Sequence, residues 1–142
     1  MQYRIEVVRN LTGHDARELL ELFAEAEFAD FADGFEWLQD AVAGSLEAVV
    51  ARNEAGKIIG FARALGDGVS DCYIQDVAVR IDCRRNGIGK ALINALLKRL
   101  RARQIDWVGL IAAPGKADFY RQLGFEVMAD FTPMRLKQQN EN

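Results

Sequence analysis

The chain has 142 residues, of which 50% are hydrophobic, and a formal net charge of −3 at pH 7. These values predict one domain, residues 1–142, with its own hydrophobic core, and they exclude a disordered chain. Two cysteines and one histidine form neither a disulfide framework nor a zinc-ligand pattern, so we predict no metal. The N-terminus lacks the apolar run of a signal peptide, and no stretch approaches the roughly 18 apolar residues of a membrane span. We therefore predict a soluble, cytoplasmic protein with no membrane partner.

Charged side chains are distributed unevenly along the chain. Between Glu18 and Ala51 there are nine acidic residues and no lysine or arginine, whereas residues 83–105 contain seven basic residues and no acidic one. One segment is thus suited to bind a cation and the other to bind an anion. Two solvated helix faces would give the same pattern, and both interpretations stay open at this point.

The N-terminal third predicts a strand followed by two helices. Residues 3–8 alternate polar and apolar side chains, as a half-exposed strand does. Thr12 and Asp15 form a weak capping box before an amphipathic helix. A second, short helix is expected within residues 30–45, where apolar side chains recur between two glycines.

The middle of the chain predicts three consecutive strands. Residues 47–52 and 58–65 flank a turn at residues 53–57, which predicts an antiparallel hairpin. Residues 72–79 are rich in β-branched and aromatic side chains and are expected to form the next strand.

The C-terminal part predicts a crossover and a final strand. Apolar side chains recur at helical spacing from residue 88 to residue 100. A buried strand at residues 107–111 and a short helix at residues 117–123 follow, and residues 125–127 and 134–136 supply material for the last strand. The order predicts an α/β (α+β) fold with a single mixed, largely antiparallel sheet, a central parallel pair and helices on both faces.

The stretch from Arg84 to Ala91 connects a predicted strand to a predicted helix and carries two glycines. Unpaired N–H groups and the positive dipole end make a helix start an anion site, and glycine lets a phosphate approach the backbone closely. The spacing does not fit a P-loop, which needs four residues before Gly-Lys-Ser/Thr, or a dinucleotide fingerprint, which needs a glycine where Leu92 stands. We therefore predict a phosphate or pyrophosphate site, with a purely structural turn as the alternative.

A second motif, Ala117-Asp-Phe-Tyr-Arg-Gln-Leu-Gly-Phe125, follows the next strand about 30 residues later. The pair of motifs resembles the GNAT superfamily of N-acetyltransferases, in close detail from Tyr73 to Phe125 and in element order over nearly the whole chain. The resemblance implies a GNAT-like acyl-CoA N-acyltransferase fold, with acetyl-CoA as the cosubstrate and an amine as the acceptor.

The resemblance also implies the residues that bind acetyl-CoA. The pyrophosphate would be bound by the turn and the first helical residues, Arg84, Arg85, Asn86, Gly87, Ile88, Gly89 and Lys90. The preceding strand matches the bulged fourth strand of the family, whose backbone at Val77, Ala78 and Val79 would face the pantetheine arm. Phe119 is a further candidate. The asparagine that many members carry after the fifth strand is missing here, and Lys116 is expected to face a cofactor phosphate instead.

In the family, a tyrosine at the position of Tyr120 protonates the departing thiolate, a role that suits a phenol. The Val77 backbone N–H would stabilise the oxyanion. Direct transfer requires a neutral amine and hence a general base. Asp76 is the first candidate, with Asp33 or Glu36 as alternatives, and each of the three is also readily explained as a surface carboxylate. Period-2 alternation does not decide which face Asp76 occupies.

The family places the acceptor against the region between the first two strands, which here is the acidic, aromatic run from Phe28 to Trp37. Asp30, Phe31, Asp33 and Glu36 are the candidate acceptor-binding residues, because carboxylates attract an ammonium and aromatic rings hold alkyl or aryl groups. The expected acceptor is a primary amine of a small cationic molecule or peptide. The alternative is that the aromatic residues are core and the acids are solvated.

The leading prediction is therefore an acetyl-CoA-dependent N-acetyltransferase that uses direct attack in a ternary complex. The alternative is a non-catalytic acyl-CoA-binding sensor or interaction module on the same scaffold. A nucleic-acid partner is not predicted, because no aromatic residues are interleaved with the basic ones and the overall pI is acidic. The oligomeric state is left open between a monomer and a homodimer.

Overall fold

The computed structural model describes residues 1–139, so the last three residues of the predicted domain lie outside the described part. The chain divides into two compact units, Met1–Leu110 and Ile111–Asn142. No helix among residues 1–139 is long and apolar enough to cross a membrane.

The first unit contains a five-stranded sheet in the order β1-β2-β3-β4-β5. Neighbouring strands are antiparallel except for β4 and β5, which are parallel, so the predicted mixed, largely antiparallel sheet with a parallel pair is confirmed. Within the described residues, however, the parallel pair lies at the edge of the sheet and not at its centre, because no strand forms after β5. The strands are β1 (Tyr3–Val7), β2 (Glu47–Asn53), β3 (Ile58–Gly66), β4 (Asp71–Val79) and β5 (Trp107–Gly109).

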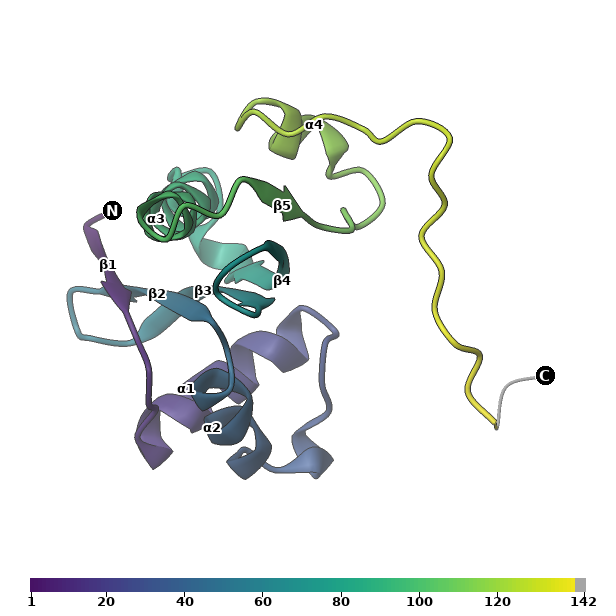
Figure 1. Ribbon diagram of the computed structural model, residues 1–142. Coiled ribbons are helices and arrows are strands. Elements are labelled where there is room, and N and C mark those ends of the chain that lie inside the picture. The colour runs from purple at the N-terminus through teal and green to yellow at the C-terminus, as the bar shows by residue number, and fades with distance from the viewer. Residues whose placement is uncertain (140–142) are drawn as a thin grey trace. The chain divides into compact units, whose positions relative to one another are not determined.

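Helices cover both faces of this sheet (Figure 1). The helices of the first unit are α1 (Gly13–Glu25), α2 (Glu36–Ala43) and α3 (Ile88–Ala102), with two short 3-10 helices, η1 (Phe31–Asp33) and η2 (Ile81–Cys83). On one face, α1 and α2 bury a core with sheet residues, among them Leu19, Leu22, Phe23, Leu38, Val42, Val50, Ile58 and Phe61. On the other face, α3 buries Leu92, Ile93, Leu96 and Leu100, all fully shielded from solvent.

The ends of α1 follow from local chemistry. The Thr12 hydroxyl accepts a hydrogen bond from the Asp15 backbone N–H at 3.0 Å, which confirms the predicted N-cap. At the other end Glu27 has a φ of 63°, and the Phe28 N–H donates to the Phe23 carbonyl at 2.8 Å. This six-residue closure satisfies a terminal carbonyl of the helix and turns the chain sharply into η1.

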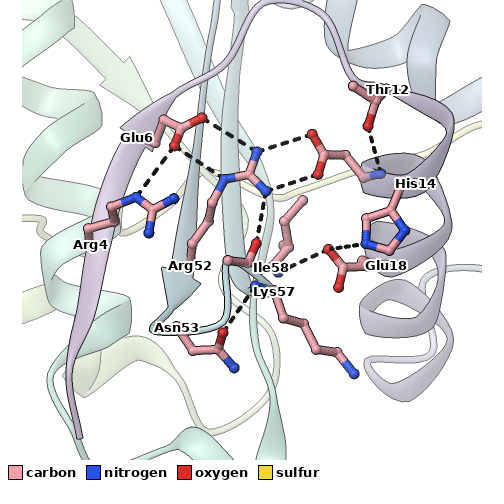
Figure 2. A network of polar contacts seen from close by, with 11 residues as sticks. Arg4, Glu6, Thr12, His14, Glu18, Arg52, Asn53, Lys57 and Ile58 are labelled. Atoms are coloured by element: carbon pink, nitrogen blue, oxygen red, sulfur yellow. Dashed lines mark hydrogen bonds and ion pairs between the residues drawn. The ribbon is translucent and has the colours of Figure 1, made fainter.

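A polar network ties the start of α1 to the sheet (Figure 2). Arg52 of β2 donates to both carboxylate oxygens of Asp15, at 2.9 and 3.1 Å, and also pairs with Glu6 of β1. A bidentate arginine–carboxylate pair fixes orientation as well as distance. Asp15, expected in a capping box with Thr12, therefore uses its side chain to join α1 to the edge of the sheet.

A buried carboxylate joins α3 to β2. The Glu47 side chain is 1% exposed and lies 3.2 Å from the guanidinium groups of both Arg99 and Arg103. Because an unpaired buried charge is costly, two arginines on successive turns hold the C-terminal end of α3 against the sheet. These basic residues of the 83–105 segment are therefore structural.

The second unit contains α4 (Ala117–Arg121), which is two residues shorter than expected. Its end is closed by the Phe125 N–H, which donates to the Tyr120 carbonyl at 3.1 Å across Gly124, whose φ is 98°. The prediction of strands at residues 125–127 and 134–136 is wrong, since neither segment forms a strand. Each is only three residues long, and Pro133 supplies no N–H for a ladder beside the second.

Candidate active site

A β-bulge interrupts β4 at the position expected from the family resemblance. Phe61 pairs with Ala78 and Arg63 pairs with Gln75, so Asp76 and Val77 together oppose the single residue Ala62. Asp76 has a φ of 58°, in the left-handed region that aspartate tolerates better than most residues. A bulge takes backbone groups out of the regular ladder, which is how a strand presents them to a ligand.

The bulge also decides which face Asp76 occupies. The carboxylate of Asp76 accepts a hydrogen bond from Arg63 Nε at 2.8 Å, and Arg63 Nη1 donates to the Ala41 carbonyl of α2 at 3.3 Å. Asp76 therefore lies on the face covered by α1 and α2. Before the bulge, by contrast, Ile74 pairs with Ala64 and shares the face of α3.

The basic turn begins immediately after η2 and ends at the first residue of α3. Arg84 donates from Nε to the Val79 carbonyl at 3.3 Å, which ties the turn to the end of β4. Asn86 donates from Nδ2 to the carbonyls of Cys83 and Arg84, at 3.0 and 3.2 Å. These two side chains thus donate to carbonyl groups of the turn and of the segment before it, and they accept no hydrogen bond from the N–H groups of the turn.

The start of α3 has no side-chain cap. Gly87 is the N-cap residue, with a φ of 76°, and it has no side chain to accept a capping hydrogen bond from the first turn. A Cβ at Gly87 would have room, since the nearest atom is the Tyr3 hydroxyl at 3.8 Å. Glycine is therefore favoured here by its left-handed backbone conformation, which places the uncapped N–H groups at an exposed turn.

The predicted cofactor-binding residues of the first unit differ in the solvent exposure of their side chains. Arg84, Arg85, Asn86 and Gly87 are exposed, and so is Lys90 in the first turn of α3. The side chains of Ile88 and Ala78 are buried in the two cores, at 2% and 7% exposure, so only their backbone groups are available to a ligand. Val77, Val79 and Gly89 are partly buried.

The acidic, aromatic segment lies on the face covered by α1 and α2. Phe23, in the core, makes edge contacts with Phe28 and Phe61 and a tilted contact with Trp37. Phe31 remains 62% exposed. Part of this aromatic cluster is therefore packed against the core and part is exposed, and the acceptor-binding role of the exposed residues stays a prediction.

Two of the candidate acceptor-binding carboxylates stabilise η1. The Asp30 side chain accepts from the Ala32 N–H at 3.0 Å, and the Asp33 side chain accepts from the Asp30 N–H at 3.1 Å. This reciprocal capping box leaves each carboxylate one oxygen for other contacts. Glu36, the first residue of α2, is exposed.

Tyr120 and Phe119 lie in α4, and Lys116 is its N-cap residue, all in the second unit. The Tyr120 ring makes edge contacts with Phe119, at a centroid distance of 4.9 Å, and with Phe125, at 5.8 Å. Burial raises the pKa of the Tyr120 phenol. The hydroxyl is therefore protonated at neutral pH, as a proton donor must be.

Neither cysteine has the environment of a nucleophile. Burial is the main reason that the pKa of the Cys72 thiol and the pKa of the Cys83 thiol are raised. Both groups therefore stay as thiols at neutral pH, and a thiol is a far weaker nucleophile than a thiolate.

Two polar residues near the turn and the bulge were not singled out from the sequence. Arg63 orients the Asp76 carboxylate, and Glu25 accepts a hydrogen bond from the Ile81 N–H at 2.6 Å. Their partners are 13 and 56 residues away in the chain. No periodicity or motif signals contacts of this kind.

The sequence and the structure of the chain were compared with those of known proteins, and both comparisons find acetyltransferases. Residues 44–127 match the family model described as "Acetyltransferase (GNAT) domain". The chain therefore belongs to the GNAT acetyltransferase family. The solved structure of a GNAT family acetyltransferase from Streptococcus pneumoniae superposes with a TM-score of 0.80 at 25% identity, over 97% of this chain and 99% of that one.

Two plant proteins are also similar in sequence. Serotonin N-acetyltransferase 2, chloroplastic, from Oryza sativa subsp. japonica is 33% identical over 134 residues, which cover 87% of this chain and 62% of the rice protein. Histone acetyltransferase TAP1 from Glycine max is 42% identical over 74 residues, which cover 52% of this chain and 32% of the soybean protein. The chain thus spans less than two thirds of either plant relative.

Proposed function

We propose that the chain transfers the acetyl group of acetyl-CoA to a primary amine by direct attack in a ternary complex. The observation that carries the proposal is a strand bulge at Asp76–Val77 followed, in the same unit, by a helix start without a side-chain cap. The bulge offers backbone donors to a thioester carbonyl, and the helix start offers them to a pyrophosphate. Membership of the GNAT family supports the same reaction.

The binding roles follow from the chemistry of each group. The N–H groups of Ile88, Gly89 and Lys90 would bind the pyrophosphate, aided by the exposed cations Arg84, Arg85 and Lys90. The backbone of Val77 to Val79 would bind the pantetheine arm, with the Val77 N–H donating to the thioester oxygen. Phe119 and Lys116 are also proposed to contact the cofactor, because they lie in the segment that resembles the GNAT superfamily.

The chemical step requires the amine to lose a proton and the sulfur to gain one. Asp76 is the proposed base, acting on the acceptor ammonium directly or through water, with Glu36 or Asp33 as alternatives. The neutral amine attacks the carbonyl carbon, and the nitrogen of the tetrahedral intermediate gives up a second proton to water. The intermediate then collapses and the carbon–sulfur bond breaks, after which the proton donor regains its proton from the solvent. Tyr120 is proposed to protonate the departing thiolate. The raised pKa of both cysteine thiols supports this direct route over an acyl-cysteine relay.

The proposed acceptor is a small cationic primary amine, with a lysine side chain as the second form. Exposed Phe31 and partly exposed Phe28 and Trp37 supply aromatic surface, and Asp30, Asp33 and Glu36 supply negative charge. The name of the rice relative specifies serotonin, an aryl-alkyl primary amine, and that of the soybean relative specifies histone. The cytoplasmic location and the oligomeric state stay predictions.

A turnover screen with Tyr120→Phe tests this function. The wild-type protein should release free thiol from acetyl-CoA in the presence of aryl-alkyl amines, polyamines or lysine peptides. Tyr120→Phe should lower kcat by about 100-fold or more while the affinity for coenzyme A stays unchanged. Tyr73→Phe is the matched control, since it removes a hydroxyl from an exposed tyrosine on β4. Coenzyme A binding without turnover for any amine class would instead favour the non-catalytic binding module.

A further inference from the structure

Glu25 connects the end of α1 to the segment that precedes the basic turn. Its Oε1 atom accepts a hydrogen bond from the Ile81 backbone N–H at 2.6 Å, across 56 residues of sequence. Glu25 is the last residue of α1, and Ile81 is the first residue of η2. A carboxylate that accepts from a backbone N–H makes one of the stronger hydrogen bonds in a protein.

The Ile81 N–H needs an acceptor from outside its own segment. The preceding N–H, that of Arg80, donates to the Ile59 carbonyl of β3 at 2.9 Å and so completes the sheet. Arg80 is also the N-cap residue of η2, but its side chain makes no capping hydrogen bond. Glu25 thus satisfies the first N–H group of η2, which a side chain at the N-cap position would not reach.

The carbonyl group of Ile81 connects η2 to the turn. The Ile81 carbonyl accepts from the Arg84 N–H at 3.4 Å, and Arg84 is the first residue of the proposed pyrophosphate site. A displacement of Ile81 would therefore be passed to Arg84 through a single hydrogen bond. The turn is held at its start by Glu25 and, through the Arg84 Nε contact with the Val79 carbonyl, by the end of β4.

Glu25 also borders the proposed acceptor segment. Immediately after it, the chain closes α1 and continues into Phe28, whose ring lies against Phe23 at 5.5 Å. One side chain thus joins the helix that leads into the acceptor segment to the segment that leads into the cofactor turn. Among residues 1–139, Glu25 is the residue of α1 that makes a hydrogen bond to η2.

We propose that Glu25 is a positioning residue for cofactor binding, which holds η2 and thereby sets the conformation of the turn at residues 84–90. The proposal rests on the proposed function, because it concerns the affinity of that turn for coenzyme A. Glu25 does not contact the reacting atoms. Its contribution is the fixed position of the Ile81 peptide group.

The test compares Glu25→Ala with Glu25→Gln in the full chain. Coenzyme A affinity is measured by calorimetry, and amide exchange at Ile81 is measured by NMR in the free protein. Glu25→Ala should weaken coenzyme A binding about three- to tenfold and speed exchange at Ile81 about tenfold, since one hydrogen bond is lost. Glu25→Gln keeps an oxygen acceptor at the same position and should stay within about twofold of the wild type. The KM for acetyl-CoA should rise in Glu25→Ala with kcat little changed.

Glu21→Ala is the matched control, one helical turn earlier on α1. Glu21 pairs with Lys57 at 3.5 Å on the surface, so its removal should change neither measurement. Equal binding by wild type and Glu25→Ala would overturn the proposal, as would equal losses in Glu25→Ala and Glu21→Ala or in Glu25→Ala and Glu25→Gln. A wild-type protein without affinity for coenzyme A would overturn the proposed function and the role of Glu25 together.

Discussion

Asp76 has a left-handed backbone conformation and a carboxylate held by Arg63 at 2.8 Å. The left-handed region favours glycine, asparagine and aspartate, so the position admits few side chains without strain. Arg63 is in turn fixed to α2 through the Ala41 carbonyl. The carboxylate proposed to act as the base is therefore pre-positioned by the fold rather than free to rotate.

Asp76→Asn separates a catalytic role from a structural one at this position. Asparagine keeps the shape of the side chain, tolerates the left-handed backbone and retains an oxygen for Arg63, but it cannot accept a proton. If Asp76 is the base, kcat/KM should fall about 100-fold or more, whereas the weakened pair with Arg63 should lower the free energy of unfolding by only about 1 to 3 kcal/mol. Asp71→Asn, at the exposed start of the same strand, is the control. A decrease in kcat/KM of less than about threefold would show that Asp76 is not the general base, and Glu36 or Asp33 would then be the candidates.

Some features of the structure were predictable from the sequence because their signals are local. Gly87 at a strand-to-helix junction and Thr12 before an amphipathic run depend on a few neighbouring residues. The face that Asp76 occupies was not predictable, since the bulge breaks the two-residue period on which such an argument relies. Glu25 was indistinguishable from the other acids of its segment, because its partner lies 56 residues away.

At the scale of elements, the distance between α3 and the sheet is set at Gly60. A Cβ at this position would lie 3.0 Å from Leu92 Cδ1 and 3.1 Å from Ile88 Cγ2, which is closer than carbon atoms normally approach. The absence of a side chain on β3 therefore lets the first turn of α3 lie close to the strands. That first turn is the proposed pyrophosphate site.

Gly60→Ala should lower the free energy of unfolding by about 1 to 3 kcal/mol, because one methyl group over-packs this core. It should also weaken coenzyme A binding, since Ile88 is the first residue of α3. Urea denaturation and calorimetry measure the two effects. Gly13→Ala is the control: its new Cβ would lie 3.8 Å from Phe35, an ordinary contact, and stability should not fall. Unchanged stability in Gly60→Ala would show that α3 can move without cost.

The helices and strands were predicted well where the periodic pattern of apolar residues extended over many residues. The sequence pattern of α3 and the hairpin of β2 and β3 correspond to the observed bounds within one or two residues at each end. The prediction of a last strand at residues 125–127 and 134–136 is wrong, because three-residue runs carry no usable period and Pro133 interrupts them. The pattern of apolar residues thus predicted the helices and strands up to α4. It did not predict the conformation of the chain after α4.

At the scale of the whole molecule, acid stability should depend on Asp15. The hydrogen bonds and charge of Arg52 hold the pKa of Asp15 below its usual value of 3.8 (Figure 2). A depressed folded-state pKa stabilises the protein above the unfolded-state value, and this contribution is lost as the pH falls through the folded-state value. Asp15 therefore stabilises the fold at neutral pH and ceases to do so in strong acid.

Asp15→Asn should be less stable than the wild type by about 1 to 3 kcal/mol at pH 7, and the difference should shrink below about pH 4. Urea denaturation at a series of pH values measures it. Glu21→Gln provides the control, since the exposed pair with Lys57 should contribute little at any pH. A stability difference for Asp15→Asn that is the same at pH 7 and pH 3 would contradict the assignment.

The extra residue in β4 is not demanded by the packing of either core. In a hypothetical chain without Asp76, Gln75 would still pair with Arg63 and Ala78 would still pair with Phe61. Val77 would then pair with Ala62, and the bulge would be absent. Both cores would keep their side chains, and the ladder would close without a gap. A chain one residue shorter would thus keep the apolar packing of both cores and lose only the ion pair between Asp76 and Arg63. The added residue therefore fits the proposed function, in which the bulge presents backbone groups to acetyl-CoA, and a family member that no longer bound an acyl-CoA would be expected to lose it.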